Sequence, residues 1–267
     1  MDFQVMTFRD RSRKKYKTKA FPKIPVLFTS INEARLYWDL IIRRVFIWHA
    51  LARPQGSVTL DFADINYHLI AEENTPVQKT IEELNDFKEV TKNWYQAFLP
   101  IFERTRSCPD TKDHLGASSL MLRYLPSRFK MTNDIRDYRR LVDIAREILE
   151  TDARNAVPGK AVFTFETTVV VSLSTVATLA PDIEVRRDAI ALLVKYPRRE
   201  GLVDSQMVVK VATWMMEQEE SEVIDGMIPE SSKLRIINND FDLKERKAVL
   251  HCSKGKGNPL PPVTLWW

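Results

Sequence analysis

Four residues in the first third of the chain have side chains that could move protons during catalysis: His49, Asp64, Tyr67 and His68. If the segment that contains Asp64 and His68 is helical, these two side chains stand one turn apart on the same face. An acid and a base placed in this way could isomerise or cyclise an apolar metabolite without a metal ion. For each of the four residues, the alternative is a structural role as a hydrogen-bonded side chain.

Metal and cofactor sites have no comparable pattern in the sequence. The two cysteines, Cys108 and Cys252, are too few for a disulfide framework or for a cysteine-based zinc site. A glycine-rich loop of the kind that cradles phosphate before a helix is also missing. We therefore expect neither a metal nor a cofactor.

The positive charge of the chain is concentrated at its start. Residues 1 to 23 contain eight basic and two acidic side chains, a net charge of +6, whereas the whole chain carries +4 and the remainder therefore −2. We expect residues 1–24 to form a solvated basic arm, with polyanion binding or nuclear import as the alternatives. No apolar leader or membrane-length apolar run occurs, so we expect an intracellular protein of the nucleus or cytoplasm.

Helical periodicity dominates the rest of the chain, in which glycine is scarce. A capping box at Ser30 opens the first expected helix, and Thr75 opens the next. We expect an all-α fold, a multi-helix bundle with a small C-terminal β-hairpin. The expected helices cover approximately residues 30–51, 75–100, 112–124, 133–150, 163–181, 183–196 and 205–220.

Three details of these helices are specific enough to test. Pro100 and Pro126 are expected to end their helices, because proline has no N–H to donate. Residues 163–181 are rich in β-branched residues that favour a strand, but the run is long for a strand, and we interpret it as a helix buried all round. In the next helix, Arg186 and Arg187 are expected to lie opposite the inward-facing side.

The segment KYPRREGLVDS, residues 195 to 205, is a charged corner between two expected helices. Pro197 should end the first helix, a glycine can take the positive φ of a tight reversal, and an aspartate can cap the second helix. Guanidinium groups at such a corner can bridge helix carbonyls and carboxylates. We expect a structural corner, with an anion-binding site as the alternative. Its residues are Arg198, Arg199, Glu200, Gly201 and Asp204.

The C-terminal region, residues 230–267, has a different character. KLRIINND and RKAVLHCS alternate as two short strands, with a turn expected at residues 238–242. The closing stretch LPPVTLWW is an apolar tail that we expect to pack on its own domain, or alternatively to offer a partner surface. The expected organisation is thus a basic arm (1–24), a helical domain (25–229), and a hairpin with its tail (230–267) packed on that domain.

Several stretches together resemble a known family. SINEARLYWDLIIRR, KNWYQAFLP, FTFETTVVV, VRRDAIALL, YPRREGLVDS and WMMEQEE occur in an order similar to that of the C-terminal regulatory domain of fungal zinc-binuclear-cluster transcription factors. The resemblance spans roughly residues 28 to 250 and is most specific from Phe163 to Glu220. The six-cysteine zinc cluster of that family is absent, and Val203 stands where tryptophan is usual. We therefore expect no sequence-specific DNA binding by this chain alone.

The resemblance implies an effector-sensing or interaction module that controls metabolic or secondary-metabolite gene expression in the nucleus. It would bind a small apolar metabolite or a protein partner, and a homodimer is compatible with the exposed apolar ends. The alternatives are a diverged isomerase or cyclase of fungal secondary metabolism, and a scaffold without a ligand. Aromatic side chains that could line an apolar pocket, or simply fill the core, are Trp38, Trp48, Trp94, Tyr95, Phe98 and Trp214.

Overall fold

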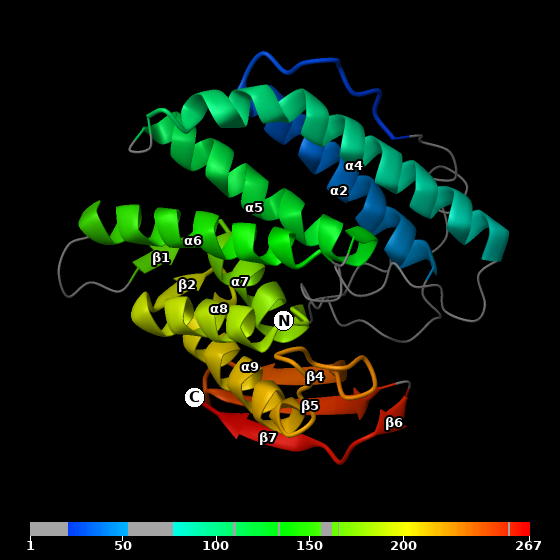
Figure 1. Ribbon diagram of the computed structural model, residues 1–267, viewed down its shortest axis with the longest axis vertical. Helices are drawn as coiled ribbons and strands as arrows, with labels where there is room; N and C mark the ends of the chain where they lie inside the picture. The colour runs from blue at the N-terminus through cyan, green and yellow to red at the C-terminus, as the bar shows by residue number, and fades with distance from the viewer. Residues whose placement is uncertain are drawn as a thin grey trace, which may run out of the picture. The chain divides into compact units, whose positions relative to one another are not determined.

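The computed structural model describes residues 21–52, 77–108, 111–132, 134–155, 162–164, 166–255 and 257–267. They form two compact units that meet in the chain between Ser107 and Cys108. The described part is mostly helical, as expected (Figure 1). The first unit contains α2 (Ile31–Ala52) and α4 (Val77–Thr105), and the second contains α5 (Lys112–Thr132), α6 (Ile135–Asn155), α7 (Val169–Leu179), α8 (Ile183–Lys195) and α9 (Ser205–Glu220).

The first unit is a helical pair joined by aromatic side chains. Ser30 caps α2 by accepting the Glu33 N–H at 3.2 Å, and the Glu33 carboxylate reaches back to the Thr29 N–H at 2.7 Å. These hydrogen bonds to Thr29 lower the pKa of Glu33. The indole of Trp94 on α4 donates to the Ala34 carbonyl on α2 at 2.9 Å. The capping box read from the sequence is therefore present, although its second bond goes to Thr29.

Two helices continue through prolines that were expected to end them. α4 runs past Pro100 to Thr105, and α5 runs past Pro126 to Thr132. Pro126 cannot donate to the carbonyl of Leu122, four residues earlier. The hydroxyl of Ser172 on α7 donates to that carbonyl instead, at 3.1 Å. A partner from a distant helix thus replaces the missing hydrogen bond, and the expectation of a helix end at Pro126 was wrong.

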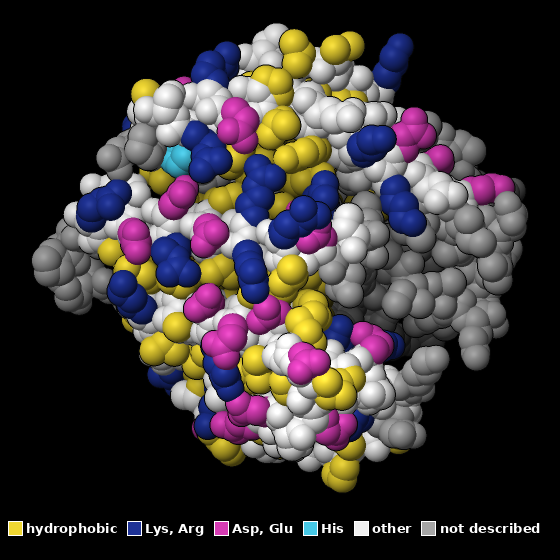
Figure 2. All heavy atoms as spheres, viewed as in Figure 1, with side chains coloured by type: hydrophobic (Ala, Val, Ile, Leu, Met, Phe, Trp, Pro, Cys, Tyr) yellow, Lys and Arg dark blue, Asp and Glu magenta, His cyan; other side chains and the backbone are white. Residues whose placement is uncertain are grey.

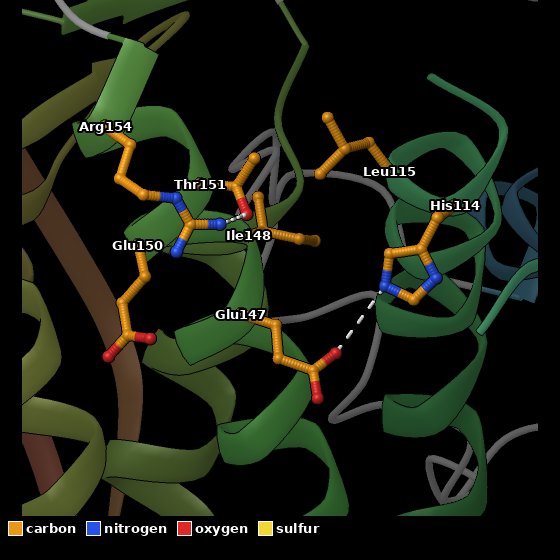
Figure 3. Close-up of a pocket in the computed structure, with 7 residues that line it drawn as sticks. All are labelled: His114, Leu115, Glu147, Ile148, Glu150, Thr151 and Arg154. Atoms are coloured by element: carbon orange, nitrogen blue, oxygen red, sulfur yellow. Dashed lines mark hydrogen bonds and ion pairs between the residues drawn. The ribbon is translucent and has the colours of Figure 1, made fainter. Parts of the chain in front are cut away.

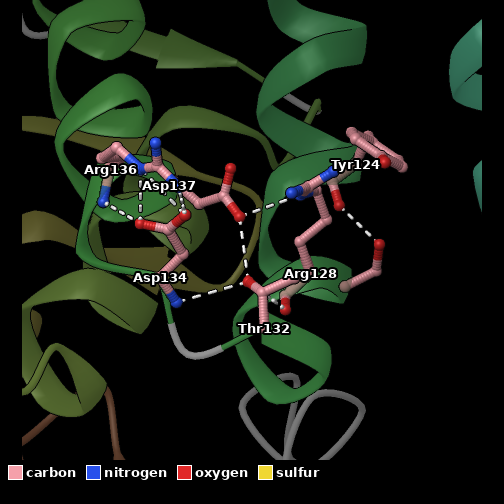
Figure 4. A network of polar contacts seen from close by, with 7 residues as sticks. Tyr124, Arg128, Thr132, Asp134, Arg136 and Asp137 are labelled. Atoms are coloured by element: carbon pink, nitrogen blue, oxygen red, sulfur yellow. Dashed lines mark hydrogen bonds and ion pairs between the residues drawn. The ribbon is translucent and has the colours of Figure 1, made fainter.

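A polar network joins the end of α5 to the start of α6 (Figure 4). Asp134 caps α6 by accepting the Arg136 N–H at 2.9 Å, and it also pairs with the Arg136 guanidinium. One turn inward, Asp137 accepts Arg128 Nε at 2.8 Å and the Thr132 hydroxyl at 3.1 Å. These contacts hold the two helices antiparallel across a short connection.

Residues 163–181 are not one helix, which corrects the expectation. The stretch begins as strand β1 (Val162–Thr164), and α7 starts only at Val169. β1 lies parallel to β2 (Arg198–Glu200), which pairs antiparallel with β3 (Val203–Asp204). The β-branched residues at the start of the stretch therefore have a strand partner, although that partner lies far along the sequence.

The C-terminal sheet contains more strands than the single hairpin that was expected. β5 (Lys247–Lys254) pairs with β4 (Leu234–Asp242) on one side and with both β6 (Asn258–Pro259) and β7 (Val263–Trp266) on the other. The asparagines and aspartates at 238–242 belong to β4, because they pair with β5, and the turn falls at residues 243–246. The apolar tail forms β7.

α9 covers one face of this sheet and makes a common core with it (Figure 1). Met215 of α9 and Leu250 of β5 are completely buried there, and Trp214 packs against the cluster. Burial in this core raises the pKa of the Cys252 thiol to about 11. The sheet, which includes the tail, and the last helix therefore pack together around one shared core.

Candidate functional site

α7 lies at the centre of the second unit and carries no charged residue of its own. Its N-cap residue, Thr168, makes no side-chain capping bond. Glu200 of β2 caps this helix instead. One of its carboxylate oxygens accepts the Thr168 N–H at 2.7 Å and the Val170 N–H at 3.0 Å. A negative charge at a helix N-terminus also interacts favourably with the helix dipole.

The remaining corner residues hold Glu200 in place. The Arg198 guanidinium pairs with Asp152 of α6 at 2.8 Å and lies 3.4 Å from the Glu200 carboxylate. Gly201 takes φ +57° and donates its N–H to Thr164 of β1 at 2.8 Å. Asp204 caps α9 by accepting the Gln206 N–H at 2.8 Å. The Arg199 side chain is exposed and donates to the Gly201 carbonyl within the turn.

The C-terminal end of α7 is capped by a cation. Arg186 of α8 donates from Nε to the Ala180 carbonyl at 2.6 Å, and its Nη1 pairs with Glu219 of α9. Both side chains of this pair are completely buried. The other Glu219 oxygen accepts the Leu234 N–H at the start of β4, at 2.5 Å. The expectation that Arg186 faces outward was wrong, because its partners come from two other elements, the C-cap of α7 and α9. Arg187 is exposed and pairs with Glu184 and Glu220.

We call these two groups, Glu200 with Arg198 and Arg186 with Glu219, the α7 clamps. Burial raises the pKa of both Glu200 and Glu219, and the neighbouring arginines and backbone N–H groups oppose that rise. The two carboxylates accept backbone N–H groups and pair with the arginines, although Arg186 Nη2 and Arg198 Nε have no hydrogen-bond partner among the described residues. The clamps therefore join α6, α7, α8 and α9, and Arg198, which the alternative expectation placed at an anion site, lies beside Asp152 and Glu200.

The aromatic residues expected to line a pocket fall into two separate places. Trp38, Trp94 and Phe98 meet in the first unit, with ring centroids 4.9 Å apart for Trp38–Trp94 and for Trp94–Phe98, and all three are at most 2% exposed. Tyr95, one residue further on, is only partly buried. Trp214 lies in the second unit, against the α9–sheet core. The side chain of Trp48 lies outside the described residues.

The four catalytic candidates of the sequence are not placed by the structure. Asp64, Tyr67 and His68 lie outside the described residues, and so does the side chain of His49. Their proposed catalytic roles stay predictions.

One histidine that sequence reasoning passed over lines a hollow of about 110 Å³ between α5 and α6 (Figure 3). His114, from the first turn of α5, is 4% exposed, and its Nε2 lies 3.7 Å from a carboxylate oxygen of Glu147 on α6. The hollow is also lined by Leu115, Ile148, Glu150, Thr151 and Arg154. The signal in the sequence was the i, i+3, i+4, i+7 spacing of polar residues from Glu147 to Arg154 on one helix face.

Charges of both signs are interspersed over α6 and α8 on the face shown in Figure 2, where no single-sign patch forms. Among the described residues, no group of three or more His, Cys, Asp or Glu side chains is arranged to hold a metal ion. Within the described ranges, no helix has both the length and the apolar character needed to cross a bilayer.

No family model, curated protein or solved structure matches the chain. The likeness to fungal regulators therefore depends on the sequence stretches named above.

Proposed function

We propose that this chain is a regulatory module of the kind found in fungal zinc-binuclear-cluster transcription factors, which binds a small apolar metabolite or a protein partner. One observation carries the proposal. Four of the stretches that create the resemblance meet around α7: FTFETTVVV leads into it, YPRREGLVDS supplies Glu200, VRRDAIALL supplies Arg186, and WMMEQEE supplies Glu219.

In these stretches, Glu200, Arg186 and Glu219 have structural roles. They cap the ends of α7 and join it to α8, α9 and β4. The alternative function, an isomerase or cyclase, rests on residues outside the described part and keeps only its support from the sequence.

A reporter assay tests the proposal. The full chain is fused to a heterologous DNA-binding domain in a fungal cell, and transcription is compared with that of the DNA-binding domain alone. We expect the fusion to change transcription, and Glu219→Gln to remove the change because it breaks a clamp. Arg199→Gln, an exposed change in the same motif, should keep it.

Two further results would separate the alternatives. Deletion of the gene with an altered metabolite and unaltered transcripts, together with a silent fusion, would favour the enzyme. The unfused chain should retard DNA only through its basic arm, so an electrophoretic shift that survives moderate salt and depends on sequence would contradict the expected lack of specific DNA binding.

A further inference from the structure

In the hollow between α5 and α6, the Nε2 atom of His114 and the Glu147 carboxylate face each other at 3.7 Å, which is longer than a good hydrogen bond. His114 Nδ1 is buried and has no hydrogen-bond partner among the described residues. Among backbone groups, a buried N–H without an acceptor is rarer than a buried acceptor without a donor, and we apply the same rule to the ring nitrogen. When the imidazole carries one proton, we therefore assign that proton to Nε2, which faces the hollow and Glu147.

The groups nearest to Nε2 are too far away to satisfy it well. The Ser118 hydroxyl lies at 3.4 Å and the Glu147 carboxylate at 3.7 Å, whereas a good N–H···O bond measures about 2.7–3.2 Å. Figure 3 shows the imidazole and the Glu147 carboxylate pointing toward one another across this gap. Nε2–H offers a donor and the carboxylate offers an acceptor, and a group seated beside both must accept from one and donate to the other.

We propose that this hollow binds a small uncharged polyhydroxylated molecule, one hydroxyl of which bridges His114 Nε2 and the Glu147 carboxylate. A hydroxyl is the simplest group that both accepts and donates a hydrogen bond. The inference goes beyond the proposed function, since it gives the module a polar site besides the apolar metabolite or protein partner that its sequence predicts.

The rest of the lining suits further hydroxyls. The Thr151 oxygen accepts an Arg154 N–H at 2.9 Å, so the Thr151 hydroxyl proton is available to donate to a second ligand oxygen. Leu115 and Ile148 supply apolar surface for the ligand's C–H groups. The volume of about 110 Å³ corresponds to roughly three to four water molecules at about 30 Å³ each, which sets the ligand at the size of a three- or four-carbon polyol.

Charge disfavours the other small ligands. The Glu147 carboxylate faces Nε2 across the hollow, so it would repel an anion placed between them. An ammonium group would place its donors against the Nε2–H donor. An uncharged polyol meets neither difficulty.

Erythritol is the probe for this inference, with ethylammonium and acetate as charged probes of similar size. The full chain is titrated with each probe while the ¹⁵N resonances of the His114 ring are followed by NMR. We expect erythritol to shift these resonances and the charged probes to leave them unchanged. Glu147→Gln should weaken erythritol binding about tenfold or more, as expected for loss of a charged hydrogen-bond partner.

Asp143→Asn is the matched control. It makes the same change of charge on the same helix, but Asp143 is exposed and is not among the residues that line the hollow, so erythritol affinity should stay within about twofold. Equal losses in both variants, a response only to ethylammonium or acetate, or no response to any probe would overturn the inference.

The outcome can be separated from that of the proposed function. If the reporter fusion changes transcription but erythritol does not bind, the ligand class fails and the regulatory proposal stands. If erythritol binds at His114 but the fusion is silent, the site stands and the regulatory proposal fails.

Discussion

Two regions of the second unit use the same chemistry, a carboxylate paired with a guanidinium, in opposite surroundings. At the α7 clamps, the Arg186 and Glu219 side chains are 0% exposed. At the turn between α5 and α6, the Arg136 side chain is 86% exposed and that of Asp134 is 24% exposed. Both regions tie a helix end to its neighbours, yet only the first does so where water cannot substitute for a lost partner.

This difference decides what each interaction is worth. A buried ion pair gives little net stability relative to apolar packing, but removal of one partner leaves a charge without water or counter-charge. An exposed pair is screened, and water replaces whichever partner is removed. The comparison therefore predicts large losses from single changes at the clamps and small losses at the turn.

The largest effect is expected at Glu219. Glu219→Gln leaves the Arg186 guanidinium buried without its anion, and the free energy of unfolding should fall by about 3–5 kcal/mol in urea denaturation. Glu220→Gln is the matched control, because Glu220 is the next residue, is half-exposed and pairs with the exposed Arg187. It should leave stability nearly unchanged.

A double-variant cycle sharpens this prediction. Arg186→Met combined with Glu219→Met removes both charges, so the loss should be clearly smaller than the sum of the two single losses. It should not vanish, because the Ala180 carbonyl and the Leu234 N–H lose their partners. Additive losses would show that the two side chains do not stabilise one another. The predicted difference between the buried clamps and the exposed turn would then not hold.

A smaller loss is expected at the other clamp. Glu200→Gln keeps the shape but weakens the bonds to the Thr168 and Val170 N–H groups, and it should cost about 1–3 kcal/mol. The hydrogen-exchange rates of these two amides should rise in the same variant, since the amides lie at the start of α7. Arg199→Gln, one residue away and exposed, should change neither quantity; an equal effect there would mean that the whole corner, and not the cap, is being disturbed.

The turn should respond less. Asp137→Asn weakens the contact with Arg128 Nε. Because the Asp137 side chain is 12% exposed and that of Arg128 is 32% exposed, water can replace part of this contact, and the expected loss is about 1–2 kcal/mol. Added salt should reduce the difference between the variant and the native chain. Asp143→Asn on the same helix is exposed and serves as the control. A loss as large as that of Glu219→Gln would break the distinction between the two regions.

Local signals in the sequence predicted the parts of this frame that local contacts build. Asp182 and Asp204 cap helices through N–H groups two or three residues away, and both could be identified from residue type and position alone. The strands β4 and β5 followed from alternation. The position of their turn did not, because Asn238 to Asp242 have turn-forming side chains but are paired by a neighbouring strand.

Partners from distant elements account for what sequence reasoning missed. The burial of Arg186 depends on Glu219, 33 residues away, and the passage of α5 through Pro126 depends on Ser172. His114 was missed for the same reason, since its hollow is made by a face of another helix. Periodicity shows which face of a helix is apolar, but it does not show which buried polar group a second element will satisfy.

The smallest effect on stability is expected from the acid titration of Asp134. This titration also compares the exposed turn with the buried clamp directly, through the pKa values of two carboxyl groups. Its side-chain and backbone hydrogen bonds with Arg136 lower its pKa from 3.8 to about 2, whereas burial raises the pKa of Glu219 above 4.5. A lowered folded-state pKa means that the contribution of Asp134 is present above pH 3.8 and is lost as the pH falls toward 2. Carboxyl ¹³C NMR titration should therefore show Asp134 ionised at a pH where Glu219 is already protonated, and Arg136→Ala should move Asp134 back toward its ordinary value. If the two carboxylates titrate in the reverse order, burial does not separate the α7 clamps from the turn.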